Sequence, residues 1–420
     1  MRGTPGISRA RFLGLAGAVG GAAALPLGAA GRAGAAPADR APAAAPTERA
    51  PGRPGRGGLT HRGVVYEVGD GETPATGWNR RAMRTDLRAV ARDLHADSVK
   101  VTGDGVERLT ATATEAAERG LNVWLEPTLG DVPERDILGH LAETGRAAER
   151  LRRQGAGVHL SVGCEFVLYV PGIVPGANIQ ERVENLLKGN FDPVVMARRL
   201  RRFTAKAART ARSVFRGPLT YAAAQDEDVD WDLFDLVGID YYAYFRRPSD
   251  YLRDLAQYRR FGKPVAVMEF GCCTFRGAPE QGGMGWDVVD YTKDPPEIKA
   301  GLVRSERAQA AYLTDVLAAF EAAGLYAAMA YTFVTRDAPH RRHDPRHDLD
   351  MASYSIVKTI EKHPGDPAAG VHWEPKDAFH ALSRQYARHH HNQRAASSVP
   401  LPRHTPAEGP SATTAYAGLQ

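Results

Sequence analysis

Residues 158–165 read Val-His-Leu-Ser-Val-Gly-Cys-Glu, a short apolar run that ends in a glutamate. Apolar runs of about four to eight residues are typical of strands that are buried on both faces, as in parallel sheets. Similar runs recur along the chain at 63–68, 98–101, 121–126, 219–222, 236–242, 264–269 and 326–333. The sequence therefore predicts eight buried strands.

Segments with helical periodicity separate these runs. Apolar residues recur at spacings of three and four over 80–94, 107–119, 136–153, 193–215, 249–261, 305–323 and 375–386. Eight strand–helix units between residues 59 and 387, without a glycine-rich phosphate loop, favour an α/β fold made of a single (β/α)₈ (TIM) barrel. A doubly wound parallel sheet is the alternative.

The two ends of the chain differ from this central region. Residues 1–36 combine early arginines, an apolar stretch and small residues, which together predict a cleavable export signal and a secreted protein. Residues 8–14 resemble a twin-arginine signal with Ala10 in place of the second arginine, so the route is twin-arginine-like or general export. An uncleaved membrane anchor is the alternative. Residues 37–58 are expected to be a Pro/Ala/Arg-rich linker and 388–420 a disordered tail.

Composition excludes several classes of protein. With 54 Lys and Arg against 49 Asp and Glu, the net charge is only +5, and the arginines are dispersed, so no nucleic-acid partner is expected. Three cysteines without metal-ligand spacing exclude a disulfide scaffold and a zinc finger. Beyond the export signal no apolar stretch is long enough to span a membrane, so the mature chain is expected to lack a span. The oligomeric state is left open.

Glu165 ends the fourth predicted strand, and Glu269 ends the seventh. In a barrel both lie at the carboxyl ends of strands, where active sites form. Strand alternation places Ser161, Gly163 and Glu165 on one face, so both carboxylates are expected to point into the barrel mouth. A carboxylate pair of this kind suits glycoside hydrolysis. The structural alternative is that each glutamate neutralises a neighbouring Arg or Lys.

From about residue 62 to 386, this layout resembles the clan of retaining glycoside hydrolases (clan A) whose acid/base and nucleophile glutamates end strands four and seven. The resemblance implies that Glu165 is the acid/base, Glu269 the nucleophile, and Tyr242 the tyrosine that hydrogen-bonds the nucleophile, with Asp240 where asparagine is common. It also implies a glycan substrate and no cofactor. Two positions depart from the clan's pattern: Cys164 replaces an asparagine, and 331–333, Tyr-Thr-Phe, replaces a tryptophan on strand eight.

Further substrate-binding residues are expected around the mouth. They are Lys100, Glu126, Phe333, His347 and Asp348. The last two belong to the His- and Asp-rich segment 340–350, whose residue types could bind a divalent ion. Arginines within that segment would repel a cation, so we expect a salt-bridged, substrate-facing loop and no metal. Adjacent Cys272 and Cys273 are expected to be free thiols.

A narrower resemblance rests on residues 269–278, Glu-Phe-Gly-Cys-Cys-Thr-Phe-Arg-Gly-Ala, and on the segment 344–354. Both are similar to bacterial proteins known as abortive infection (phage-exclusion) proteins. Three functions are therefore carried forward: a secreted retaining glycosidase, a barrel that binds a carbohydrate or envelope ligand without catalysis, and a phage-defence factor. For the first, we predict carboxyl groups about 5–5.5 Å apart and a raised pKa of Glu165.

Overall fold

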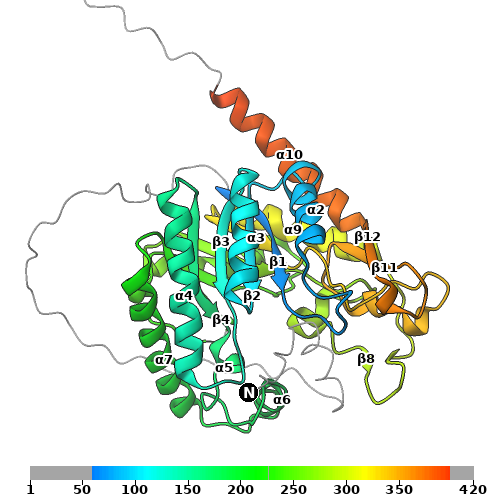
Figure 1. Cartoon of the computed structure of the whole chain (residues 1–420), viewed down its shortest axis with the longest axis horizontal. Coiled ribbons are helices and arrows are strands. Elements are labelled where there is room, and N and C mark those ends of the chain that lie inside the picture. The colour runs from blue at the N-terminus through cyan, green and yellow to red at the C-terminus, as the bar shows by residue number, and fades with distance from the viewer. Residues whose placement is uncertain (1–58, 226, 398–420) are drawn as a thin grey trace, which may run out of the picture.

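The computed structural model describes residues 59–225 and 227–397, which form a (β/α)₈ barrel (Figure 1). Eight parallel strands follow the order β5-β4-β3-β2-β1-β10-β7-β6. The ring closes between β5 and β6, where the Asp240 N–H donates to the Ala223 carbonyl at 2.8 Å. The barrel strands are β1 (His61–Val68), β2 (Ser98–Gly103), β3 (Asn122–Pro127), β4 (Val158–Cys164), β5 (Leu219–Ala222), β6 (Val237–Asp240), β7 (Val265–Phe270) and β10 (Ala327–Ala330). The prediction of eight strands in a barrel is thus confirmed.

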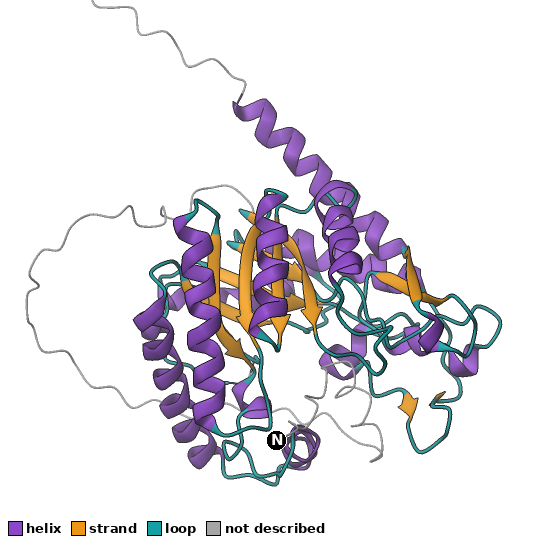
Figure 2. Ribbon diagram, viewed as in Figure 1, coloured by secondary structure: helices purple, strands orange, loops and turns teal. Residues whose placement is uncertain are grey.

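Helices surround the strands on the outside (Figure 2). They are α2 (Arg80–Arg92), α3 (Val106–Glu118), α4 (Glu134–Arg153), α7 (Pro193–Val214), α8 (Pro248–Leu255), α9 (Glu306–Ala322) and α10 (Asp377–Ser397). Capping residues fix where several of them begin. Asn79 accepts the Ala82 N–H before α2, and Asp192 with a following proline starts α7. The predicted helix 249–261 is divided into α8 and a 3₁₀ turn at Ala256–Phe261.

Several short elements were missing from the sequence prediction. Helices α5 (Phe166–Tyr169) and α6 (Ile179–Lys188) follow β4, and the pair β8 (Val289–Asp290) and β9 (Glu297–Ile298) follows β7. A hairpin of β11 (Val357–Glu361) and β12 (Val371–Pro375) follows β10. All of them connect the carboxyl end of a barrel strand to the next large helix, and in Figure 1 α5 and α6 lie at the end toward which the strand arrows point. They therefore surround the barrel mouth.

Three of the predicted segments lie at the two ends of the chain. The expected export signal at 1–36 and the linker at 37–58 lie outside the described residues. Helix α10 continues past residue 388, where the tail was expected to begin, and the rest of that tail is also outside the described part. Among the described residues, no helix combines the length and apolar character needed to cross a membrane.

The bottom of the barrel is closed by neutral aromatic and polar side chains. The ring of His159 stacks on Trp124 with centroids 4.0 Å apart, and its Nε2 lies 3.1 Å from the hydroxyl of Tyr326. The same hydroxyl contacts His61, whose Nδ1 lies 3.0 Å from the Ser98 hydroxyl. Burial lowers the pKa of His159 to about 3, so the ring is neutral at pH 7. The polar groups of these four side chains are therefore buried in contact with one another.

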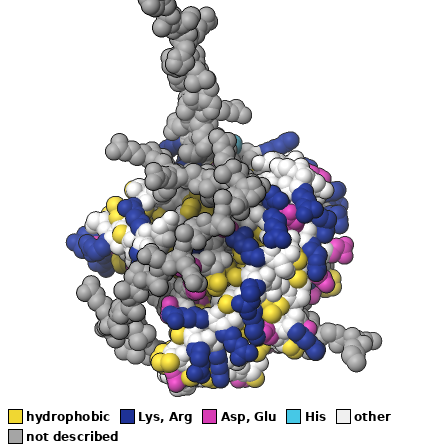
Figure 3. Space-filling view, turned by 90° about the vertical axis from the view of Figure 1, so that its left-hand side faces the viewer, with side chains coloured by type: hydrophobic (Ala, Val, Ile, Leu, Met, Phe, Trp, Pro, Cys, Tyr) yellow, Lys and Arg dark blue, Asp and Glu magenta, His cyan; other side chains and the backbone are white. Residues whose placement is uncertain are grey.

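Some of the basic residues of α7 lie on the surface and are paired with acids. Arg201 contacts Asp228, and Lys206 contacts Glu134 of α4. Figure 3 shows Lys and Arg side chains distributed over this face with acidic side chains among them. The dispersed arginines of the sequence are thus dispersed in space as well.

Candidate active site

Glu269, near the end of β7, is fully buried and bound by two donors from other strands. The Lys100 ammonium on β2 lies 2.8 Å from Oε1, and the Tyr242 hydroxyl, two residues beyond β6, donates to Oε2 at 2.8 Å. The Glu269 carbonyl accepts the Tyr241 N–H at 2.7 Å, which ties the end of β6 to β7. Tyr242 therefore contacts Glu269 as the sequence resemblance implied.

Lys100 joins Glu269 to a second buried carboxylate. Its Nζ lies 2.8 Å from Oε1 of Glu126, which also accepts the Thr102 hydroxyl at 3.0 Å. All four side chains are inside the barrel and essentially without exposed surface. Burial alone would lower the pKa of Lys100, but the charges of Glu126 and Glu269 raise it above its ordinary value. Lys100 thus pairs with both Glu126 and Glu269, and the expected contact of Lys100 and Glu126 with substrate stays a prediction.

Asp240 and Cys164 lie beside this ion-paired group. The Cys164 thiol is 3.5 Å from Oδ2 of Asp240, and both side chains are buried. Burial, and next the charge of Glu269, raise the pKa of Asp240 well above its ordinary value. This shift favours the protonated form of Asp240, and the Lys100 ammonium lies between the carboxylates of Glu126 and Glu269.

Glu165 lies just past the end of β4 in a different setting. Its backbone is left-handed, with φ 39° and ψ 57°, a region that residues with a Cβ rarely adopt. The expected alternation of Ser161, Gly163 and Glu165 on one strand face is wrong, because the pairing of β4 with β5 shifts between Ser161 and Cys164. Gly163, at φ 146°, supplies that irregularity. The side chain of Glu165 is half-buried.

Two residues that the sequence analysis missed hold the turn that carries Glu165. The Tyr221 hydroxyl accepts the Phe166 N–H at 2.6 Å and donates to Glu227 at 2.7 Å. Glu227 also accepts the Val167 N–H at 3.1 Å. We call Tyr221 and Glu227 the turn clamp. The two amides that follow Glu165 are thereby fixed by side chains from β5 and the loop after it.

The carboxyl of Glu227 is perturbed by its position. Burial raises its pKa to about 8, with a contribution from the charge of Glu165, against the lowering effect of the Tyr221 and backbone hydrogen bonds. Two glutamates close enough to affect each other's ionisation therefore lie on this side of the mouth. Sequence periodicity could not identify Glu227 as a functional residue, because Glu227 lies in a loop.

Cys164 connects the surroundings of the two predicted catalytic glutamates. Its sulfur lies within 4.8 Å of ligand atoms of Glu126 and Glu269, and within 4.8 Å of Glu165 and Asp240. The nearest carboxylate oxygens of Glu165 and Glu269 are thus at most twice that distance apart. Both glutamates reach one site, and the predicted separation of about 5–5.5 Å stays a prediction.

A tyrosine follows β10, the eighth strand of the barrel, where the clan has a tryptophan. The Tyr331 hydroxyl donates to Glu67 at 3.0 Å, and its ring centroid lies 6.5 Å from that of Tyr242. Phe333 instead packs against Tyr66 and Trp373 and has no exposed surface. Tyr331 thus lies beside Tyr242, and Phe333 belongs to the core. The sequence showed two aromatic residues in the segment 331–333. It did not show which of the two lies beside Tyr242.

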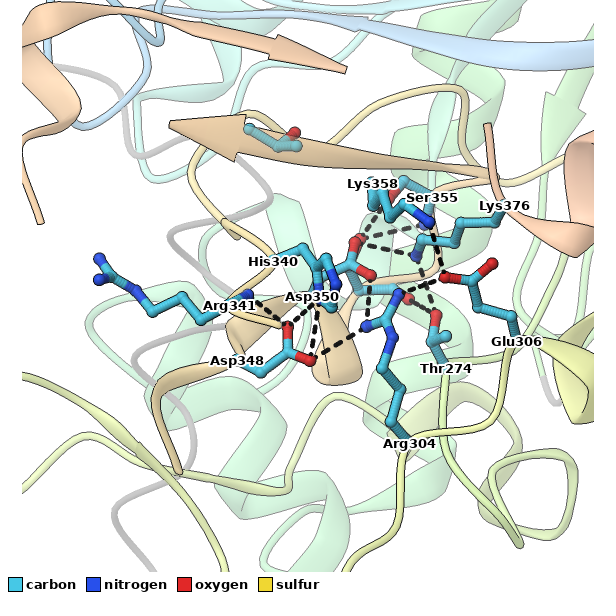
Figure 4. A network of polar contacts seen from close by, with 12 residues as sticks. Thr274, Arg304, Glu306, His340, Arg341, Asp348, Asp350, Ser355, Lys358 and Lys376 are labelled. Atoms are coloured by element: carbon cyan, nitrogen blue, oxygen red, sulfur yellow. Dashed lines mark hydrogen bonds and ion pairs between the residues drawn. The ribbon is translucent and has the colours of Figure 1, made fainter. Parts of the chain in front are cut away.

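Figure 4 shows a network of ion pairs in the loops after β7 and β10. Asp348 contacts His340 at 3.0 Å and Arg304 at 3.2 Å, and buried Asp350 lies 2.8 Å from Arg304 and 2.9 Å from Lys376. The expected salt-bridged loop is present. His347 is paired with Asp344 at 2.7 Å. The structure thus gives His347 and Asp348 protein partners, and their contact with substrate stays a prediction.

Three clusters among the described residues bring potential metal ligands together. Two contain Cys164, and the third is His340, Asp348 and Asp350. In the third, Arg304 and Lys376 already supply positive charge to the aspartates. Lys100 does the same beside Glu126 and Glu269 in the first. In these two clusters the carboxylates therefore serve as partners of protein cations. Cys272 and Cys273 are buried free thiols, as predicted.

Comparison with solved structures identifies similar folds. Two structures of a GH113 β-1,4-mannanase align with TM-scores of 0.50 and 0.51 and identities of 14% and 15%, each covering 78% of this chain and 99% of the other. Fpglu1 from Fervidobacterium pennivoraus aligns with a TM-score of 0.50 and 11% identity, covering 80% of this chain and 97% of its own. No family model and no curated protein matches the sequence.

At these identities the likeness establishes the fold. The mannanase structures give no support to the phage-exclusion resemblance, which stays a prediction. The chain therefore shares the barrel architecture of these enzymes, and any activity has to be argued from its own side chains.

Proposed function

We propose that the chain is a retaining glycoside hydrolase that acts on a glycan without a cofactor. The observation that carries this proposal is the binding of Glu269 by both Tyr242 and Lys100 at the carboxyl end of β7, on the site that Glu165 reaches from β4. The shared fold of the mannanase structures supports it. A secreted location, with the export signal at 1–36, is part of the proposal.

In this mechanism the two glutamates have different roles. Glu269 attacks the anomeric carbon and forms a glycosyl-enzyme, while Glu165 donates a proton to the leaving oxygen. Water, deprotonated by Glu165, then releases the sugar. The Lys100 ammonium and the Tyr242 hydroxyl favour the ionised form of Glu269, which is the form that attacks. Cys164 and Asp240 lie between the two glutamates, where the clan has asparagines.

The test is a screen of the purified protein on a panel of aryl glycosides. A 2-fluoro sugar that traps a glycosyl-enzyme should label Glu269, and mass spectrometry of the peptide containing residues 265–270 should find the adduct. Proton NMR of the first product should show the anomer of the substrate, as retention requires. Product of the opposite anomer would contradict retention. Sugar binding without turnover would favour the non-catalytic alternative.

A further inference from the structure

Cys164, Glu165 and Asp240 bring three potential metal ligands together inside the proposed active site. The Cys164 sulfur and one carboxylate oxygen from each acid all lie within 4.8 Å of one another. Cys164 ends β4, Glu165 follows it directly, and Asp240 ends β6. The barrel thus places a thiol and two carboxyls around one point, although their strands are far apart in the sequence.

The spacing of the two buried members matches a tetrahedral metal site. A tetrahedral Zn²⁺ with one sulfur at about 2.3 Å and one oxygen at about 2.0 Å holds these two atoms about 3.5 Å apart. The Cys164 sulfur and Oδ2 of Asp240 lie 3.5 Å apart. An oxygen of Glu165 is within 4.8 Å of the other ligand atoms, so a small side-chain rotation brings it into the same coordination sphere. A fourth position is left for water.

Asp240 also has an oxygen whose hydrogen-bonding capacity is not used. The residue is only 2% exposed, and its Oδ1 has no hydrogen-bond partner among the described residues. A buried carboxyl oxygen without a partner is costly. A cation bound through both oxygens, or a water on that cation, would satisfy Oδ1. This observation is independent of the ligand spacing and points to the same ligand.

The surrounding charges also favour a cation at Asp240. Burial is the first cause of the raised pKa of Asp240, and the charge of Glu269 is the second. The charges of Glu165 and Glu126 act in the same direction, and that of Lys100 opposes them. Several carboxylates thus disfavour a further negative charge at Asp240, and a bound divalent ion relieves that condition.

The neighbouring cluster of Cys164 with Glu126 and Glu269 suits an ion less well. Both of its carboxylates contact the Lys100 ammonium at 2.8 Å, so a metal would have to replace that ammonium. Glu165, in contrast, is half-buried, and the cluster that contains it has a partly exposed side. An ion can therefore reach Cys164 and Asp240 past Glu165.

We propose that Cys164, Glu165 and Asp240 form an inhibitory site for a thiophilic divalent cation, of which Zn²⁺ is the ordinary example. The sulfur ligand selects such an ion over Mg²⁺ and Ca²⁺, which prefer oxygen alone. Cys164 binds as the thiolate, and its proton passes to the solvent. Binding stands on these residues alone, whereas inhibition rests on the proposed function, because the ion occupies the carboxyl that must exchange a proton. The ion stops the reaction and is not a cofactor.

Titration with Cd²⁺ measures binding apart from turnover. The full-length protein is reduced with a phosphine and freed of metal by a chelator. Cd²⁺ bound to a thiolate gives a charge-transfer absorption in the ultraviolet, which carboxylate and histidine ligands do not give. One thiolate-bound Cd²⁺ per chain is expected, with a Kd on the order of micromolar or below. Zn²⁺ should displace it, and about hundredfold excess Mg²⁺ should not.

Two cysteine variants assign the thiolate. Cys164→Ala should abolish the absorption. Cys272→Ala, which also removes a buried free thiol, is the matched control and should retain it. Circular dichroism without metal checks that each variant is folded, and Cys164→Ser replaces Cys164→Ala if the alanine variant is not. No absorption in the unmodified protein, or an absorption that survives the loss of the Cys164 sulfur, would overturn the proposal.

Two acid variants assign the oxygen ligands. Asp240→Asn and Glu165→Gln should each weaken Cd²⁺ binding at least about tenfold, since partners outside the ligand shell alone contribute about 10- to 100-fold to metal affinity. Glu184→Gln, on α6 and paired with Lys188, is the matched control and should leave the affinity unchanged. Unchanged affinity in both Asp240→Asn and Glu165→Gln would contradict the site.

Inhibition is the last measurement. Zn²⁺ should inhibit hydrolysis by the unmodified protein and by Cys272→Ala alike, and a chelator should restore it. Cys164→Ala, compared with its own metal-free rate, should need at least about tenfold more Zn²⁺. Cd²⁺ binding at Cys164 without inhibition by Zn²⁺ would overturn the inhibitory role.

The outcomes separate this proposal from the proposed function. Cd²⁺ binding at Cys164 with no hydrolysis of any glycoside would leave the ion site standing and remove the glycosidase. Hydrolysis without a thiolate absorption would do the reverse.

Discussion

Glu269 and Glu165 both follow barrel strands, yet the protein holds them by opposite means. Glu269 has no exposed surface, and a buried ammonium and a tyrosine hydroxyl bind its two oxygens. Glu165 is half-buried, and its position depends on a left-handed backbone whose next amides are held by the turn clamp. Two side-chain donors thus bind the Glu269 carboxylate, and two side chains hold the backbone amides that follow Glu165.

This difference matches the two proposed tasks. A nucleophile must stay ionised and motionless, and fixed donors on both oxygens provide that. An acid/base must gain and lose a proton in each cycle, and the half-buried Glu165 carboxyl at the end of β4 suits that exchange. Because both residues are glutamates, their environments, and not the residue type, distinguish the two proposed roles.

Removing each carboxyl should separate the roles most clearly. Glu269→Gln should lower kcat at least about 10⁴-fold on every substrate, since no covalent intermediate can form. Glu165→Gln should cost about 10²- to 10⁴-fold on substrates with poor leaving groups, and much less on activated aryl glycosides that leave without a proton. Steady-state kinetics on both substrate types measure this.

Rescue by azide tests the same division of roles. It should restore turnover by Glu165→Gln with an activated substrate, giving a glycosyl azide of retained configuration, because a small anion can replace the activated water. Glu269→Gln should give no retained azide. Similar losses for the two variants on all leaving groups would mean that the roles are not divided as proposed.

Lys100→Met should have the largest effect on stability. It leaves Glu126 and Glu269 buried together without their cation, and removing one partner of a buried ion pair costs about 3–5 kcal/mol. Denaturant unfolding measures the loss. The acid limb of the pH–rate profile should also move to higher pH, because Glu269 is harder to ionise without the ammonium.

A second substitution controls for that effect. Glu126→Gln added to Lys100→Met removes one of the two stranded charges and should recover part of the lost stability. No loss in the single variant would contradict the account of Lys100 as the cation that holds Glu269.

Sequence periodicity was sufficient for the barrel, because both faces of each strand are covered and the runs are continuously apolar. It also placed Glu165 and Glu269 at the carboxyl ends of barrel strands, and the clan resemblance correctly implied the contact of Tyr242 with Glu269. The prediction failed at Gly163, where one irregular residue breaks the alternation on which the orientation of Glu165 had been argued. Local backbone irregularities leave no periodic signal.

Contacts between residues far apart in the sequence were the second feature that could not be predicted. Lys100 and Glu126 were predicted to bind substrate, but the contacts of Lys100 with Glu126 and Glu269 depend on how the barrel strands lie relative to one another. Tyr221 and Glu227 gave no signal at all. Nothing in a single sequence shows that a tyrosine on strand five receives an amide from the turn after strand four.

The turn clamp can be broken without touching either catalytic carboxyl. Tyr221→Phe removes the acceptor of the Phe166 N–H and a donor to Glu227, which should cost about 1–3 kcal/mol of stability because both groups are buried. If the clamp positions Glu165, kcat should fall about tenfold on poor leaving groups and hardly at all on activated ones. A merely structural effect would lower both equally. Tyr251→Phe, which removes a hydroxyl that accepts the Phe245 N–H, is the matched control.

Per pH unit, the smallest expected effect is a pH dependence of stability that comes from Glu227. Its pKa is raised from 4.5 to about 8 in the folded protein, by burial first and by the charge of Glu165 in part. Between these values the folded state keeps the proton that the unfolded state has lost, so this group's contribution to stability is full below pH 4.5 and is lost as pH rises to about 8. The slope is at most about 1.4 kcal/mol per pH unit. Glu227→Gln does not titrate, so its stability relative to the unmodified protein should rise across this window and level off above it. Urea unfolding of both proteins, with Glu184→Gln as control, measures the difference; a constant or falling difference would mean that Glu227 is ionised beside Glu165 throughout, and that the acid/base side of the mouth holds two charges instead of one.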